Sequence, residues 1–360
     1  MHNEEHAVEL IRLCIRILRT IDCISLKQED YLVLFLSCYL HDISMVVQPH
    51  LESFCRDDIR TDILATDFMG QVCSKIVNKT ADLKDVKEWM VASFEKVYGY
   101  FENGIRSRHP YDSAEFVKKH ASSYFRYLSV PIIQAVSEVS ESHGWDIAEV
   151  YGRRSQAKSN LLSMKYMMIL IRLADLLDMS KDRVNYFLLK ENMRNLSSLS
   201  RFHWISHFIT NRVELTAKYD NQGTDDNPFR PIQETIYINI YLNVNFKIET
   251  SNRVDNCKWK ASINENVNLH SNYEFEHFPK IESESGSNSD PSCSKCFFMC
   301  KWMHTKHDWL FPELQELEHY INLINRSLFT SKIKVNIIFE SESGLDQDLF
   351  DSVYSFLCKN

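Results

Sequence analysis

Histidine and aspartate side chains recur along the first half of the sequence, next to apolar segments. His41 and Asp42 are adjacent at the end of the apolar segment YLVLFLSCYL, and Asp175 lies within the apolar segment LIRLADLLDM. A carboxylate inside an apolar helix is costly unless it is paired or binds a metal ion. Other segments contain further candidate ligands, namely His6, His109 and His143. Imidazole and carboxylate bind first-row transition ions, and two such ions can hold a phosphate and generate a hydroxide nucleophile.

These candidate ligands need helices to position them, and the sequence up to about residue 195 predicts helices throughout. The first apolar face has helical spacing and contains Ala7, Leu10, Cys14 and Ile17. Further helices are expected at 32–40, 86–101, 130–139 and 161–177. Asp112 or Ser113 is expected to cap another helix. Because the candidate ligands come from different helices, they are expected to converge in the core of a bundle.

After about residue 200, apolar residues alternate with polar ones, which predicts strands. The alternation covers 213–219, 236–246 and 333–339, and a helix with apolar residues between 314 and 328 precedes the last strand. We therefore expect a mainly helical chain, with a helical domain over 1–195 and a smaller α+β domain over 196–360. The segment ESESGSNSDPS, at 282–292, is expected to be a mobile loop in the second domain.

The composition of the 360-residue chain is that of a globular protein, with 44% hydrophobic and 25% charged residues. Its 8 glycines form no G-x-G-x-x-G or P-loop motif, and the net charge of −8 disfavours duplex nucleic acid as a partner. The charged N-terminus does not fit a signal peptide, and the best apolar run is about half the ~20 residues that a membrane span needs. The 10 cysteines are expected to be reduced thiols. We expect a cytoplasmic protein that does not contact membranes.

The order of the candidate ligands along the chain resembles that of the HD superfamily of metal-dependent phosphohydrolases. The segment RLADLLDMSKDR is similar to the last motif of the HD-CE-type members and their relatives, in which LRLAD-x-LD is followed by Arg. The contexts of His109, after Arg-x-x, and of His143, before Gly, resemble the branches that bind two metals. The resemblance covers roughly residues 1–190 and implies an HD-type helical bundle.

The resemblance also implies one or two divalent ions, with Mn, Fe, Co and Mg as candidates. The first ion would be held by His6, His41, Asp42 and Asp175, and the second by Asp42, His109 and His143. A bridging hydroxide would attack phosphorus, and the expected catalytic residues are Asp42, His50 and His109. His50 falls where the dNTP triphosphohydrolases of the superfamily place a histidine that assists the leaving group. Asp178, one turn after Asp175, is expected to cap its helix or to orient a ligand.

Basic residues near the candidate ligands are expected to bind substrate phosphate, with a solvated surface position as the alternative for each. They are Arg106, Arg108, Arg153, Arg154, Lys158 and Arg183. As a group they favour a nucleotide or polyphosphate substrate. His203 and His207, in RFHWISHFI, are expected to pack at the entry to the C-terminal domain, with metal ligation as the alternative.

Cysteine and histidine side chains gather again near the C-terminus, in PSCSKCFFMCKWMHTKH. The spacing of a structural zinc site is found in Cys293, Cys296, Cys300 and His304. The run that follows Cys296 is apolar and aromatic, so packing of these residues along a helix is the alternative. Neither role would be catalytic.

We expect a metal-dependent hydrolase of nucleotide phosphate bonds, and the resemblance favours a deoxynucleoside triphosphate triphosphohydrolase. The alternatives are a nucleotide- or metal-binding sensor without turnover, a cyclic-nucleotide phosphodiesterase and a single-strand nuclease. The C-terminal domain is expected to form a homo-oligomer or to bind a partner protein. Bacterial stress signalling and antiviral defence against phage are roles that such a layout could serve.

Overall fold

The computed structural model of the chain describes residues 4–21, 26–46, 104–152, 163–179, 181–184, 188–189, 191, 198–220, 232–243, 272–274, 298–324 and 329–340. The helix expected at 86–101 and the loop expected at 282–292 lie outside these residues. The chain divides into two compact units: the first contains the described residues up to Tyr31 and from Asp146 onward, and the second contains those from Leu32 to Trp145. The predicted domain boundary at residue 195 stays a prediction.

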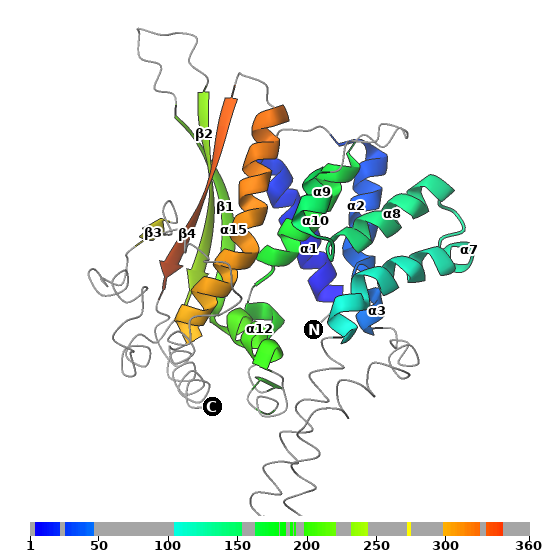
Figure 1. Cartoon of the computed structure of the whole chain (residues 1–360), viewed down its shortest axis with the longest axis horizontal. Helices are drawn as coiled ribbons and strands as arrows, with labels where there is room; N and C mark the ends of the chain where they lie inside the picture. The colour runs from blue at the N-terminus through cyan, green and yellow to red at the C-terminus, as the bar shows by residue number, and fades with distance from the viewer. Residues whose placement is uncertain are drawn as a thin grey trace, which may run out of the picture. The chain divides into compact units, whose positions relative to one another are not determined.

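The first unit combines long helices with a sheet. Its described helices are α1 (Glu4–Thr20), α9 (Ile147–Gly152), α10 (Met164–Leu177), the 3-10 helix η2 (Lys181–Arg183), α12 (Ser198–Ile209) and α15 (Phe298–Ile324). Helix α1 packs against α10, and α15 packs against α9, α10 and the sheet (Figure 1). Every residue from Tyr166 to Ile171 in α10 is buried, as expected of a helix that is apolar all round and lies inside the core. The expected apolar face of α1 is also buried.

The sheet of the first unit has four strands in the order β1-β2-β4-β3. They are β1 (Thr210–Asp220), β2 (Ile232–Leu242), β3 (Asn272–Glu274) and β4 (Phe329–Phe339). Strand β2 is antiparallel to β1 and parallel to β4, and β3 is antiparallel to β4. Parallel neighbours need a crossover connection, and α15 lies between β2 and β4 in the sequence and packs against β4. Alternate residues of β2, namely Ile236, Ile238 and Ile240, are buried as the sequence pattern predicts.

The second unit is helical. It contains most of α2 (Gln28–Leu40), then α3 (Ile43–Val46), a helical segment at 104–119, α7 (Ala121–Tyr124) and α8 (Val130–Ser142). Serines join these helices at close range, because Ser37 Oγ donates to the carbonyl of Val136 at 3.3 Å and Ser137 Oγ donates to the carbonyl of Ala114 at 3.2 Å. Small hydroxyl side chains therefore let the helices that carry the candidate ligands approach one another.

The expected fold class is confirmed, since the chain is mainly helical with a sheet in its C-terminal part. One detail of the prediction was wrong. The helix at 104–119 runs straight through Asp112 and Ser113, so neither residue caps it. Helix α15 begins at Phe298 and so includes part of the run after Cys296, for which a helix was the expected alternative to a zinc site. Among the helices that the structure describes, none combines the length and apolar composition needed to cross a membrane.

Candidate metal centre

The second unit places His41 and Asp42 in a tight turn between α2 and α3. Helix α2 ends at Leu40, and the amide of His41 still donates to the carbonyl of Ser37 at 2.8 Å. The amide of Met45 then donates to the carbonyl of Asp42 at 2.9 Å, which starts the next helical turn. Both side chains are buried, and His41 Nε2 lies 3.2 Å from Asp42 Oδ2. The turn therefore fixes a carboxylate and an imidazole in one buried place, as the sequence pattern predicts.

His109 and His143 bring two more imidazoles to Asp42 within the same unit. His109 lies on the helical segment 104–119, and His143 is the C-cap residue of α8. Asp42 Oδ1 lies 3.1 Å from His109 Nε2 and 3.6 Å from His143 Nε2. The ligand atoms of these three residues all lie within 4.8 Å of one another, so the three could hold a metal ion. These are the residues that the resemblance assigns to the second metal.

The three histidines beside Asp42, namely His41, His109 and His143, are oriented in the same way by the backbone. Each places its Nδ1 against the carbonyl three positions upstream, namely at 3.1 Å for His41, 2.5 Å for His109 and 2.5 Å for His143. A carbonyl can only accept, so we assign the ring proton of each neutral histidine to Nδ1. The Nε2 atoms then carry lone pairs, which is the state in which histidine binds a metal.

The two Nε2 atoms of His109 and His143 lie only 2.8 Å apart. With Nδ1 as the donor in both rings, two lone pairs face each other, beside the Asp42 carboxylate. Such an arrangement of acceptors is stable when a cation, either a proton or a metal ion, lies among them. Two imidazoles and a carboxylate suit a first-row transition ion. The donor set therefore fits the divalent metal that the resemblance implies.

Two serines, Ser44 and Ser113, hold the backbone of this cluster, a role that the sequence did not predict for them. Ser44 Oγ donates to the carbonyl of His109 at 3.0 Å, and the hydroxyl of Ser113 lies 3.0 Å from that of Ser44. The Ser44 amide also donates to Ser113 Oγ at 3.2 Å. Ser44 thus ties the His41-Asp42 turn to the helix that carries His109.

Gly144 allows His143 to approach His109. A Cβ atom added at Gly144 would lie 2.7 Å from Cβ of Pro110, which is closer than such atoms pack, and nearer still to Cγ of the same ring. Pro110 directly follows His109, and a proline ring cannot rotate away as a flexible side chain can. The two imidazoles can therefore meet only because residue 144 has no side chain.

Gly144→Ala is expected to weaken metal binding by about 10- to 100-fold, because separating Pro110 from residue 144 also separates the two imidazoles. Calorimetric titration of the metal-free protein with Mn²⁺ measures the change. The matched control is Gly152→Ala in α9, where an added Cβ meets no atom within 4 Å. Equal affinity in the two variants would show that the contact with Pro110 does not position the histidines.

The first unit holds the other two candidate ligands, His6 and Asp175. His6 lies in the first turn of α1, is buried, and places its Nε2 3.6 Å from Asp175 Oδ1. Its Nδ1 lies 2.6 Å from Asp178 Oδ2. Asp178 is the C-cap residue of α10, and its Oδ2 also accepts from Arg183 Nη1 at 2.9 Å. The carboxylate of Asp178 thus fixes the His6 ring with Nε2 toward Asp175. Carboxylates commonly orient metal-binding histidines in this way, through the ring nitrogen that does not face the metal.

The sequence argument for Asp175 was partly wrong. We expected Asp175 to be a costly buried acid, but its side chain is 38% exposed, whereas that of Asp178 is fully buried. Both lie at the end of α10, and their different burial depends on packing by α1 and η2 rather than on the apolar pattern. The charge-assisted contacts to His6 and Arg183 offset the free-energy cost of burying the Asp178 carboxylate.

Three of the basic residues expected to bind phosphate lie within the described residues. Arg183 contacts Asp178, with a side chain that is 13% exposed, and Arg108 Nη2 lies 3.5 Å from Asp112 Oδ1 on the same helix. Arg106 supplies the carbonyl that accepts from His109. Several candidates lie outside the described residues, namely His50, Arg153, Arg154 and Lys158.

The zinc prediction is not tested by the structure. Cys293 and Cys296 lie outside the described residues, and positions 300 and 304 fall within α15. The six predicted metal ligands divide between the two units: His6 and Asp175 belong to the first, and His41, Asp42, His109 and His143 belong to the second. The predicted first ion would draw its ligands from both units, and that ligand set stays a prediction.

Comparison with known proteins gives one match. The family model named HD-CE matches residues 1–227, which is more than half of the 360-residue chain. The matched segment contains all the candidate ligands of the divalent ions, namely His6, His41, Asp42, His109, His143 and Asp175. Searches of curated proteins and of solved structures found no match.

Proposed function

This chain belongs to the HD-CE family, and from that premise we propose that it is a metal-dependent phosphohydrolase that acts on nucleotides. The family and the cluster of Asp42, His109 and His143 support an HD-type hydrolase domain that could hold a divalent metal. The observation that carries the proposal is the 2.8 Å separation of His109 Nε2 and His143 Nε2 beside the Asp42 carboxylate. In this geometry the acceptor atoms of Asp42, His109 and His143 converge, as the ligands of a metal ion do.

The residues of the chain have distinct tasks in this proposal. Asp42, His109 and His143 would hold the ion in the second unit, and the backbone carbonyls at Nδ1 keep the imidazole rings in the metal-binding tautomer. When bound, a divalent ion supplies Lewis acidity to a phosphoryl oxygen and lowers the pKa of bound water. His6 and Asp175 present the same pairing of ring nitrogen and carboxylate in the first unit.

The substrate class follows from the chemistry that such a centre supports. Divalent ions and cationic side chains together stabilise the charge of a transferring or leaving phosphate. We propose a nucleotide, and first a deoxynucleoside triphosphate, because the order of the ligands resembles that of triphosphohydrolases. Hydrolysis would then release the deoxynucleoside and intact triphosphate. Stress signalling or antiviral defence would be the biological setting.

The test is turnover of a nucleotide panel by the full chain. Deoxynucleoside triphosphates, nucleoside triphosphates, monophosphates and cyclic nucleotides are incubated with Mn²⁺, and the products are separated by chromatography. Turnover is expected for at least one member, and excess chelator is expected to abolish it. His109→Gln should lose the activity.

The matched control is His120→Gln. His120 follows the same helical segment as His109, but its ring packs against Phe116 at a centroid distance of 4.3 Å. This variant should hydrolyse the substrate at the wild-type rate. Turnover that persists in excess chelator would contradict the proposal, and so would wild-type turnover by His109→Gln. Metal binding without turnover of any member would favour the sensor alternative.

A further inference from the structure

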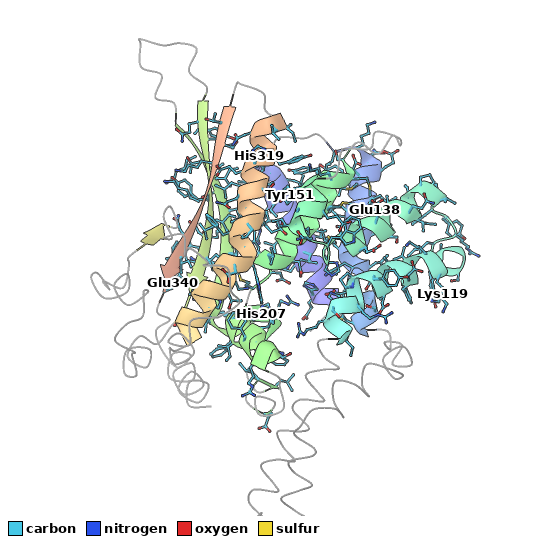
Figure 2. The ribbon with its side chains drawn as sticks, in the orientation of Figure 1. Lys119, Glu138, Tyr151, His207, His319 and Glu340 are labelled. Carbon is cyan, nitrogen blue, oxygen red and sulfur yellow. The ribbon has the colours of Figure 1, made fainter. Side chains whose placement is uncertain are left out.

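A second cluster of ionisable side chains lies in the first unit, beside Asp175. Lys306 of α15 is only 9% exposed, and Trp309 follows it by one helical turn. Helix α12 contributes His203 and His207, and the ring of His203 stacks on Trp309 with centroids 5.3 Å apart (Figure 2 labels His207). The proposed hydrolytic chemistry assigns no role to Lys306 or His207.

Lys306 lacks the partner that a buried ammonium group needs. Within the described residues, no side chain or carbonyl forms a hydrogen bond or a close ion pair with it, and its nearest aromatic contact is the Trp309 ring, 5.7 Å from Nζ to the centroid. Burial lowers the pKa of Lys306 to about 8, while the nearby Asp175 raises it and Arg183 lowers it further. The side chain is therefore mainly charged at neutral pH. A buried charge without a partner is costly, so we infer that an anionic ligand binds beside the Lys306 ammonium.

His207 of α12 carries a complementary group in the same unit. Among the described residues, its buried Nδ1 has no hydrogen-bond partner. Burial lowers the pKa of His207 well below its usual value, and the nearby charges of Arg183 and Lys306 lower it further. The backbone of Met179 acts in the other direction and raises this pKa. A neutral His207 whose ring proton lies on Nε2 has an acceptor at Nδ1, which suits a ligand that carries a hydroxyl proton.

The two carboxylates near Lys306, those of Asp175 and Asp178, already contact other side chains. Asp178 is engaged by His6 and by Arg183, and Asp175 faces His6 Nε2 as a candidate metal ligand. With both carboxylates so engaged, the Lys306 ammonium is, within the described residues, a positive charge that is left for a ligand. The stacked rings of His203 and Trp309 form a flat wall beside it, and the burial of Lys306 strengthens an ion pair.

We propose that Lys306 and His207 form a subsite for a terminal phosphate group, with Lys306 binding an anionic oxygen and His207 accepting from the hydroxyl of a monoprotonated phosphate. This inference rests on the proposed function in one respect, since it takes the ligand to be a phosphate compound of the kind that a nucleotide hydrolase binds. The subsite lies entirely in the first unit, and Lys306 comes from the C-terminal part of the chain, beyond the 1–227 match. The C-terminal part would thus contribute to phosphate binding.

The test uses Lys306→Met in the full chain, with inorganic tripolyphosphate as the probe in the presence of Mn²⁺. Methionine keeps the length of the side chain and removes the charge. Binding measured by calorimetry is expected to weaken at least about tenfold, because a close charged contact is lost. Without the probe, the melting temperature is expected to rise by about 2–4 °C, since the unpaired buried charge is gone. A purely structural lysine would give a lower melting temperature instead.

The matched control is Lys218→Met. Lys218 of β1 is exposed and lies over an aromatic ring, with Nζ 5.1 Å from the centroid of Tyr237, so the variant removes the same charge from a similar contact. It should bind the probe as the wild type does. Wild-type affinity in Lys306→Met would overturn the proposal. If that variant does not fold, His207→Gln replaces it, and unchanged binding would be equally decisive.

Turnover is measured on the same preparations, so that the two proposals can fail separately. Lys306-dependent binding of tripolyphosphate by a protein that hydrolyses no nucleotide would support the subsite and contradict the hydrolase. Turnover by a wild type whose affinity for tripolyphosphate does not depend on Lys306 would support the hydrolase and contradict the subsite. A nucleoside without phosphate serves as a further probe, and its binding should not change in Lys306→Met.

Discussion

Asp42→Asn is expected to remove the metal bound in the second unit and to lower nucleotide turnover by about a thousandfold or more. Asp42 is the only carboxylate in the described cluster with His109 and His143, and an amide is a much poorer ligand than a carboxylate for a divalent ion. Loss of metal-based stabilisation costs several kcal/mol in the transition state, and about 4 kcal/mol corresponds to a thousandfold change in rate. Metal content by mass spectrometry and turnover by chromatography measure the two effects.

The control for this prediction is Asp112→Asn, on the helix that carries His109. Asp112 contacts only the partly exposed Arg108 at 3.5 Å among the ion pairs described, so its loss should leave metal content and turnover unchanged. Circular dichroism should show that Asp42→Asn keeps its helices. A variant that unfolds would make Asp42 a structural residue, and a full metal complement would show that Asp42 is not a ligand.

Much of the fold could be predicted because burial imposes a period on the sequence. The alternation of Ile236, Ile238 and Ile240 predicted a strand, and these side chains are buried in β2. Strand β3 could not be predicted in this way, since it has only three residues and pairs at the edge of the sheet.

The candidate site was predicted by residue type but not by geometry. The order of histidines and aspartates along the chain pointed to His41, Asp42, His109 and His143, which the second unit brings together. The devices that orient them are mostly backbone carbonyls, which carry no signature in the side-chain sequence. The His-Gly pair at 143–144 was the one available signal, and its meaning became clear only from the position of Pro110.

Lys306 illustrates a different limit of sequence reasoning. A lysine in a helix is most often solvated, but this one is buried where α12 packs against α15. The sequence could not place Lys306 near Asp175, because 131 positions separate the two residues and their proximity depends on how α10 and α15 are aligned. The alignment of these two helices is therefore a condition for the proposed phosphate subsite.

A buried ion pair sets that alignment. Arg172 of α10 donates from Nε to Glu313 Oε1 of α15 at 2.8 Å, and Nη2 contacts the same oxygen. The two side chains are only 10% and 5% exposed. Arg172 lies one turn before Asp175, and Glu313 lies two turns after Lys306. Tyr151 of α9, which is labelled in Figure 2, adds a hydrogen bond from its hydroxyl to the carbonyl of Glu313 at 3.2 Å, and burial raises the pKa of this tyrosine.

Arg172→Met is expected to lower the free energy of unfolding by about 3–5 kcal/mol, because it leaves the buried Glu313 carboxylate without its cation. The double variant Arg172→Met with Glu313→Leu should recover most of that loss, since an apolar pair of similar volume replaces the ions. Urea unfolding, monitored by circular dichroism, measures the free energy of unfolding of the single and the double variant.

Arg108→Met, which removes one partner of a partly exposed pair, should cost less than about 1 kcal/mol and serves as the control. The double variant should also bind tripolyphosphate less tightly than the wild type even where its stability is restored, because the apolar pair does not fix the register of α10 against α15. A double variant as unstable as the single one would show that Glu313 is not the group left uncompensated. Full phosphate affinity in a stable double variant would show that other contacts hold Asp175 and Lys306 in place.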